Sequence, residues 1–342
     1  MTTIASITIS MVLYTSTLLV SSSNTWQTAW ACLELNAFSI LPQISKTKHP
    51  RAIEAATKYF LTQATASCML LFSATANAWQ TGSWDITQMH NNWASTMMLI
   101  AIAMKVGAAP THFWLPEVMQ GSTLTTALII STWQKIAPVA LMYSTFNHIP
   151  PNLAIIIGLL SMVTGGWGGM NQTQLRKMMA YSSITNMGWT VMILPIEPKM
   201  SIMNILIYII MTIPTFMLMK LMLTKTLKDT ATSWTTSATG ATALMFLLLS
   251  TAGLPPLTGL APKIMILMEL INQGLTPAAV LATTASLLNL VFYLRTAYLT
   301  TILNPPGSAT LTAKWRQKIH SNAVVCTPTA TTSIMTTPAL VH

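Results

Sequence analysis

The sequence predicts an all-α protein that crosses a membrane many times. Charged residues make up 7% of its 342 residues, against roughly 25% in soluble globular proteins, and apolar residues make up 52%. So few charges cannot cover the surface of a water-soluble domain of this length. The apolar residues also gather into runs of the length that a spanning helix needs, which is about 20 residues. We therefore expect one integral membrane domain over residues 1–342.

This length rule predicts about eleven spans, separated by short loops. Two of the runs are too long for one straight helix, and each contains a Gly/Pro interruption, VGAAPTHFWLP in the first and GLPPLTGLAP in the second. Because glycine and proline interrupt helices, we predict that each of these runs is one discontinuous crossing. The predicted spans are 2–20, 26–44, 55–76, 94–120 (discontinuous), 122–146, 153–170, 175–195, 201–223, 241–275 (discontinuous), 277–303 and 322–341.

The basic residues of the loops favour one orientation of these spans. When successive loops alternate between the two faces, one face receives nearly all of them and the other receives only Lys199. By the positive-inside rule, the first face is the cytoplasmic side or its organellar equivalent, and residue 1 lies on it. Topology thus explains the net charge of +10, and we expect no nucleic-acid partner. The residues of the positive face are Lys46, Lys48, Arg51, Arg176, Lys177, Lys225, Lys228, Lys314, Arg316 and Lys318.

Three lysines lie at mid-depth in predicted spans, and each has a proline within five residues. A charged side chain at the bilayer centre costs at least about 2.5–3.5 kcal/mol, so it persists mainly where it faces protein or water and marks a functional site. Proline opens the helix ladder and leaves carbonyls near the ammonium. Buried charges beside broken helices are typical of transporters and pumps. The lysines are Lys105, Lys135 and Lys263, beside Pro110, Pro138 and Pro262.

These lysines and one central acid, Glu34, are candidates for a proton path. At about 4 Å and an effective dielectric near 20, a lysine and a carboxylate attract each other by roughly 4 kcal/mol. Moving Glu34 towards or away from Lys105 would therefore switch the lysine between holding and donating its proton. We predict Glu34 as the modulating partner, Lys105 as the input site, Lys135 as the central relay and Lys263 as the terminal acceptor. Spacing alone does not place Glu34 against Lys105.

Two further residues are possible relays, and an alternative applies to each. His112 lies in the first interruption and either extends the relay through water or is simply packed beside Phe113. Two alternatives apply to Glu269. It pairs with Lys263, or it stays unpaired because residues six apart in sequence do not share a helical face. A different alternative applies to the lysines, namely that fixed ion pairs hold helices together. Three lysines, however, cannot all pair with one central carboxylate.

The sequence shows no cofactor or metal motif. Its cysteines lack CxxC-type spacing. The GGWGG run, Gly165 to Gly169, lacks the GxGxxG spacing and the surrounding βαβ pattern of a dinucleotide-binding loop. Close helix packing or a tight exit turn explains the run better than nucleotide binding does. We expect no flavin, nicotinamide, haem or iron–sulfur cluster in this chain. Any electron chemistry would lie in other chains.

Several sequence blocks resemble the antiporter-like membrane subunits of respiratory complex I. The blocks are LELNAFSILP, MKVGAAPTHFWLPEVMQG, TWQKIAPVALMY, GGWGGMNQTQLRKMMAYSSITNMGW and GLPPLTGLAPK. The resemblance implies two inverted five-helix repeats, at about 1–146 and 153–303, each with one broken helix, and a C-terminal span at about 322–341. It also implies that Glu34 and Lys105 are the charge pair of the family, Lys135 its central lysine and Lys263 the lysine of its second broken helix. Asn186 stands where many relatives have histidine, so no relay role is expected there.

The function that this resemblance implies is proton translocation in a multi-pass subunit of the mitochondrial inner membrane, as part of an NADH:ubiquinone reductase. The N-terminus would lie in the matrix and the C-terminus in the intermembrane space. Other membrane-arm subunits and membrane lipids would be its partners, without direct NADH binding, while FMN, iron–sulfur clusters and ubiquinone would belong to partner subunits. Two alternatives remain: a stand-alone or Mrp-type cation/proton antiporter subunit, and a structural membrane scaffold. An antiporter would more often carry acidic cation ligands at mid-depth, where only Glu34 clearly qualifies.

Overall fold

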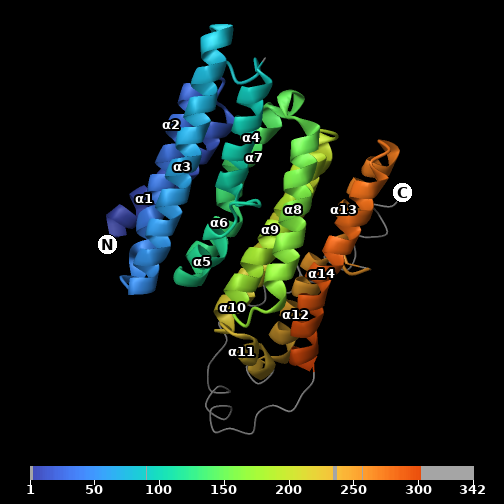
Figure 1. Ribbon diagram of the computed structural model, residues 1–342. Coiled ribbons are helices and arrows are strands. Elements are labelled where there is room, and N and C mark those ends of the chain that lie inside the picture. The colour runs from blue at the N-terminus through green and yellow to red at the C-terminus, as the bar shows by residue number, and fades with distance from the viewer. Residues whose placement is uncertain (1–2, 90, 234–236, 256, 302–342) are drawn as a thin grey trace. The chain divides into compact units, whose positions relative to one another are not determined.

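The computed structural model describes residues 3–89, 91–233, 237–255 and 257–301 (Figure 1). Helices are the regular elements of these residues, and the only β-type pairings described are two isolated bridges, between Thr25 and Asp85 and between Gln174 and Thr226. The all-α prediction is therefore confirmed for the part of the chain that is described. The last predicted span, 322–341, lies outside it.

The chain divides into two compact units. The first holds residues up to Ser161 together with Val191–Lys199, and the second holds Met162–Thr190 together with the described residues from Met200 onward. The boundary falls inside helix α8 (Pro151–Met170). The predicted repeats at 1–146 and 153–303 are defined by symmetry rather than by compactness, so they stay a prediction.

In the first unit, α3 is the central helix. It packs against α2, α4 and α5, while α1 packs against α2 and α7, and α7 also contacts α4 (Figure 1). Each predicted span of this unit coincides with a helix or a pair of helices. The elements are α1 (Thr3–Ser21), α2 (Trp26–Ile44), η1 (Ser45–Thr47), α3 (Pro50–Thr81), α4 (Asn92–Val106), α5 (Trp114–Gly121), α6 (Leu124–Ser131), α7 (Trp133–Ser144) and η2 (Phe146–His148).

Local chemistry explains where α3 and α4 begin and end. Helix α3 begins with a proline at its first position, where no N–H is needed, and the ring of His49 accepts a hydrogen bond from the N–H of Arg51. It ends at Gly82, whose φ of 70° favours glycine. Helix α4 begins after Asn91, whose side chain accepts a hydrogen bond from the N–H of Trp93 at 2.9 Å. These caps satisfy main-chain groups that the helix ends leave open.

The run 122–146, predicted as a single span, is interrupted at Thr132 between α6 and α7. Thr132 has φ −115° and ψ −73°, and its hydroxyl donates to the carbonyl of Leu128 at 2.7 Å. Pro138 in α7 has no N–H for the carbonyl of Gln134, which weakens the hydrogen-bond ladder just after the interruption. The predicted span is present, as the segment Leu124–Ser144, with a local break in its helix at Thr132.

The second unit contains the C-terminal half of α8, most of α9 (Leu175–Ile193) and α10 (Pro198–Leu221), and the helices that follow. Helix α14 is the common neighbour of α11, α12 and α13. The short helix α11 lies in a stretch predicted as a loop, and a capping box between Thr226 and Asp229 begins it. The following helices are α11 (Leu227–Thr232), α12 (Ala238–Ala252), α13 (Leu260–Asn272) and α14 (Thr276–Thr301).

The GGWGG run of α8 is a close-packing surface. A Cβ atom at Gly168 would lie 2.3 Å from the ring of Tyr181 in α9, and one at Gly169 would lie 2.8 Å from the ring of Phe292 in α14. A side chain at either position would displace one of these rings, so the two glycines allow the rings to pack directly on the backbone of α8. The packing interpretation of this run is confirmed.

Five helical segments are both long enough and apolar enough to cross a membrane, among the described residues. Each lies within a predicted span or matches it to within a few residues. The breaks predicted in the two longest runs are also present, between α4 and α5 and between α12 and α13. The number of crossings stays a prediction. The five segments are Ile4–Ser21, Leu124–Ser144, Pro151–Met170, Pro198–Leu221 and Thr276–Thr300.

Candidate functional site

The first interruption lies directly after Lys105, in the last turn of α4. Gly107 ends the helix with a φ of 84°, and its N–H bonds to the carbonyls of Ala103 and Met104. The indole N–H of Trp114, at the start of α5, also donates to the carbonyl of Met104, at 3.3 Å. The carbonyls of Ala103 and Met104 at the end of α4 are therefore satisfied within the segment, which is a requirement for non-helical backbone at membrane depth.

The structure places Glu34 of α2 against Lys105. The Lys105 Nζ atom lies 3.6 Å from Oε1 of Glu34, and the two side chains are 4% and 20% exposed. Neither of these two atoms has a hydrogen-bond partner among the described residues. The pair is thus held by its opposite charges in a weakly screened environment, and each atom keeps capacity for a further hydrogen bond.

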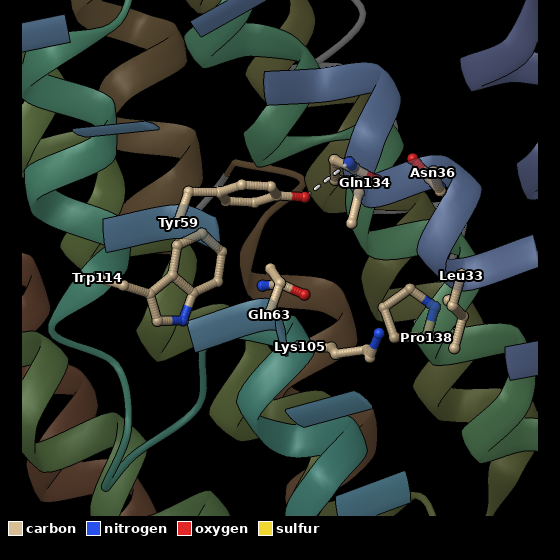
Figure 2. Close-up of a pocket in the computed structure, with 9 residues that line it drawn as sticks. Leu33, Asn36, Tyr59, Gln63, Lys105, Trp114, Gln134 and Pro138 are labelled. Carbon is tan, nitrogen blue, oxygen red and sulfur yellow. Dashed lines mark hydrogen bonds between the residues drawn. The ribbon is translucent and has the colours of Figure 1, made fainter. Parts of the chain in front are cut away.

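A small cavity adjoins this ion pair (Figure 2). Its volume of about 20 Å³ is enough for about one water molecule. Figure 2 shows the ammonium of Lys105 directed to the side of Leu33 and Pro138, with the amide of Gln63 beside the lysine. The phenol of Tyr59 lies across the cavity and accepts a hydrogen bond from the amide of Gln134 at 3.2 Å.

The polar part of this lining was not predicted. Asn36 and Gln63 are buried, and the Asn36 Oδ1 atom has no hydrogen-bond partner among the described residues. A water molecule needs two to four polar partners, and the ammonium, these amides and the Tyr59 hydroxyl are such groups. The available signal was the presence of amide side chains inside apolar runs, with Tyr59 and Gln63 one helical turn apart in α3.

Lys135 is buried, with 2% of its surface exposed, and lies just after the interruption at Thr132. Its neighbour Gln134 and the nearby Pro138 line the cavity beside Lys105. Helix α7 therefore brings the segment of Lys135 to the site of the ion pair. The role of Lys135 as a relay stays a prediction.

Lys263 lies in the second interrupted crossing and belongs to the second unit. It is buried, and its Nζ atom donates to the carbonyl of Ala252, the last residue of α12, at 2.7 Å. The loop folds back tightly, because a Cβ atom at Gly259 would lie 1.8 Å from the carbonyl oxygen of Ser250. The ammonium thus sits at the C-terminal end of a helix, where the helix dipole favours a cation.

The two possible relays differ in their surroundings. His112 is buried in the loop between α4 and α5, and its ring centroid lies 4.3 Å from that of Phe113. Glu269 is half-buried in α13, and it forms no ion pair with Lys263 in the described structure. The structure therefore favours the unpaired alternative for Glu269. The relay role of each residue stays a prediction.

Comparison with known proteins decides the family. A family model described as the transmembrane region of NADH:quinone oxidoreductase and Mrp antiporter subunits matches residues 23–289. This chain belongs to the NADH:quinone oxidoreductase/Mrp antiporter family. The match includes each of the proposed site residues.

Within this family, the curated relatives are complex I subunits. NADH-ubiquinone oxidoreductase chain 2 of Salmo salar is 51% identical over 300 residues, which are 88% of this chain and 86% of the relative. The same subunit of Xenopus laevis is 48% identical over 295 residues, which are 86% of each chain. This chain is therefore a homologue of that complex I subunit along most of its length.

Solved structures confirm the antiporter-like fold. A chain of respiratory complex I from Thermus thermophilus aligns with a TM-score of 0.81 at 22% identity, covering 98% of this chain and 80% of the other. A chain of the Mrp complex from Dietzia sp. aligns with a TM-score of 0.81 at 14% identity, covering 97% and 74%. At such identities the likeness shows the fold alone.

Proposed function

We propose that this chain is a core membrane-arm subunit of respiratory complex I, which conveys or pumps protons across the mitochondrial inner membrane. The observation that carries the proposal is the ion pair between half-buried Glu34 and buried Lys105, 3.6 Å apart at a broken helix and beside a cavity with room for about one water molecule. Homology with complex I subunits along most of the chain favours coupling to NADH-to-ubiquinone electron transfer in other subunits.

The geometry suggests the order of proton steps. Lys105 holds a proton while the carboxylate of Glu34 stabilises its ammonium. When Glu34 withdraws or is itself neutralised, Lys105 passes a proton from Nζ to water in the cavity and becomes a neutral amine. The hydroxyl of Tyr59 and the amide of Gln134 orient that water towards α7. In α7, Lys135 accepts the proton.

Lys263 is the proposed terminal acceptor. Its ammonium is stabilised by the carbonyl of Ala252 and by the C-terminal end of α12. That stabilisation is lost when Lys263 releases its proton towards the opposite face. His112 and Glu269 are proposed as secondary relays at the two interrupted crossings.

The assembly follows from the same proposal. FMN, the iron–sulfur clusters and ubiquinone would be bound by partner subunits, as would NADH, and other membrane-arm subunits and lipids would surround this chain. We propose about eleven crossings, arranged as inverted repeats at about 1–146 and 153–303 with a last span at 322–341. The N-terminus would lie in the matrix and the C-terminus in the intermembrane space.

The second candidate is a subunit of an Mrp-type cation/proton antiporter. The observation that favours it is the TM-score of 0.81 with a chain of an Mrp complex, the same value as with complex I. Native separation of mildly solubilised membranes, followed by mass spectrometry, distinguishes the two. Co-migration with flavin and iron–sulfur subunits and with NADH dehydrogenase activity supports complex I, whereas migration with other carriers and no redox subunits supports the antiporter.

The decisive variant is Lys135→Met in the assembled complex, reconstituted into vesicles. We expect normal assembly but fewer protons translocated per NADH oxidised, because a methionine cannot accept a proton. Lys199→Met is the matched control, since Lys199 is an exposed lysine at the start of α10. A wild-type ratio of protons to electrons in Lys135→Met would refute the relay and would favour the structural scaffold.

A further inference from the structure

A second, much larger pocket lies in the second unit, away from the buried lysine of that unit. It has a volume of about 620 Å³, within the range of ligand-binding pockets. Helix α11, the C-terminal part of α14 and the loop after α8 form its walls; Figure 1 shows α11 beside the end of α14. We call it the α11–α14 pocket, and its lining includes Thr173, Thr226, Lys228, Ala231, Arg295 and Leu299.

Backbone hydrogen bonds fix the walls of the α11–α14 pocket. The N–H of Leu227 donates to the carbonyl of Thr173 at 3.0 Å, and the N–H of Leu175 donates to the carbonyl of Lys225 at 3.2 Å. The guanidinium of Arg295 donates from Nη1 to the carbonyl of Met170 at 2.9 Å. These bonds join three segments that are distant in sequence, so the pocket is formed before a ligand arrives.

The charge around the α11–α14 pocket is strongly positive. Lys228 and Arg295 line it, and Lys225 lies in the same loop. The neighbouring acid is Asp229, whose carboxylate accepts hydrogen bonds from the main-chain N–H groups of Lys225 and Thr226 and so caps its own helix. A guanidinium has five N–H groups, so Arg295 can hold the Met170 carbonyl and also bind an anion.

Aromatic side chains mark the depth of the α11–α14 pocket. Trp167, near the end of α8, is 69% exposed, and Tyr298, near the end of α14, is 64% exposed. Tryptophan and tyrosine gather at the level of the lipid headgroups. Beyond that level α14 presents exposed apolar side chains, among them Val291 and Leu294. The pocket therefore combines a cationic wall at headgroup depth with an apolar helix that leads into the membrane.

We propose that the α11–α14 pocket binds the phosphate headgroup of an anionic glycerophospholipid, whose acyl chains lie along α14. The two cations complement the phosphate, and basic pockets on the matrix or cytoplasmic side are suited to such headgroups. A soluble phosphate would not need the apolar part of the wall, and a zwitterionic lipid would gain less from the positive charge. The ligand is therefore a lipid with net negative charge.

The test uses the whole complex, stripped of lipid and returned to phosphatidylcholine vesicles. One set of vesicles contains a minority of photoactivatable phosphatidylglycerol and the other contains photoactivatable phosphatidylcholine. After illumination, mass spectrometry locates the labelled peptides. We expect phosphatidylglycerol to label the peptides that contain Lys228 and Leu299 in preference to phosphatidylcholine. Lys228→Gln and Arg295→Gln should each weaken this labelling about fivefold, which corresponds to about 1 kcal/mol for each basic residue near an anionic surface.

The matched control is Lys225→Gln, which removes a charge from the same loop without removing a pocket-lining residue. Little change in Lys225→Gln supports the pocket, whereas an equal loss shows diffuse surface charge and overturns it. Equal labelling by both lipids would show general solvation of the helices and would also overturn it. Displacement by inorganic phosphate at matched ionic strength would assign the pocket to a free anion. Cross-links from Lys228 to residues 302–342, with no lipid label, would show that the chain itself covers the pocket.

Discussion

Replacement of Glu34 by glutamine removes the negative charge of the Glu34–Lys105 ion pair while it preserves the shape of the side chain. At the observed separation of 3.6 Å and an effective dielectric near 20, the attraction between Glu34 and Lys105 is about 4–5 kcal/mol. Water entering the adjoining cavity will solvate Lys105 in the variant and so offset part of the lost attraction. Even a residual of about 1.4 kcal/mol changes the balance between charged and neutral Lys105 tenfold. We therefore expect Glu34→Gln to slow coupled NADH:ubiquinone turnover and to lower the number of protons moved per NADH.

The assay compares NADH oxidation with acidification or alkalinisation inside vesicles that contain the reconstituted complex. Glu54→Gln is the matched control, because Glu54 forms an exposed ion pair with Lys58 one turn along α3, and such pairs contribute about 0–1 kcal/mol. The double variant Glu34→Gln with Lys105→Met should be little worse than Lys105→Met alone if the two residues act as one unit. Wild-type coupling in Glu34→Gln, with the complex fully assembled, would refute the reasoning.

Three further predictions concern the cavity and the second interrupted crossing. Gln134→Leu removes the hydrogen bond to Tyr59 and a polar side chain from the cavity wall, so proton translocation should fall while the complex stays assembled. The loss in stability should be about 0.5–1.5 kcal/mol. Unchanged proton pumping would exclude Gln134 from the proton path. Gly259→Ala places a methyl group against the Ser250 carbonyl, which should destabilise the fold by about 1–3 kcal/mol. The melting temperature of the complex should therefore fall. A normal melting profile would show that the loop relaxes easily. Lys263→Met leaves the Ala252 carbonyl without its charged donor, and this loss should lower the stability by about 1.5–3 kcal/mol. The number of protons translocated per electron should also fall. Retention of both stability and proton pumping would remove Lys263 from the mechanism.

The sequence was sufficient for features that depend on neighbouring residues or on a scarcity of charge. Span limits follow from apolar run length, and both predicted interruptions follow from glycine and proline in runs that are too long for one helix. Because only one acid was central in a span, Glu34 was the natural candidate to face Lys105, and the structure places them 3.6 Å apart.

Features that depend on the register between helices were not predictable in the same way. The cavity beside Lys105 requires side chains from α2, α3, α5 and α7 to lie close together. No single segment of the sequence predicts this arrangement. The interruption at Thr132 leaves the apolar pattern of its run unchanged, so hydropathy cannot reveal it. The pairing of Glu269 was uncertain because sequence spacing cannot tell whether a main-chain carbonyl will bind Lys263 instead, as that of Ala252 at the end of α12 does.

The two interrupted crossings hold their lysines in physically different ways. Lys105 ends the first half of its crossing, in the last turn of α4, whereas Lys263 begins the second half of its crossing and reaches back to the last carbonyl of α12. Both ammonium groups thus lie at the C-terminal end of a half-helix, where the dipole stabilises a cation. The difference lies in the second partner. Glu34 can lose its charge or move, whereas the carbonyl of Ala252 has a fixed dipole. We therefore propose that the pair of Glu34 and Lys105 controls proton loading, and that Lys263 holds a proton until a change in the loop releases it.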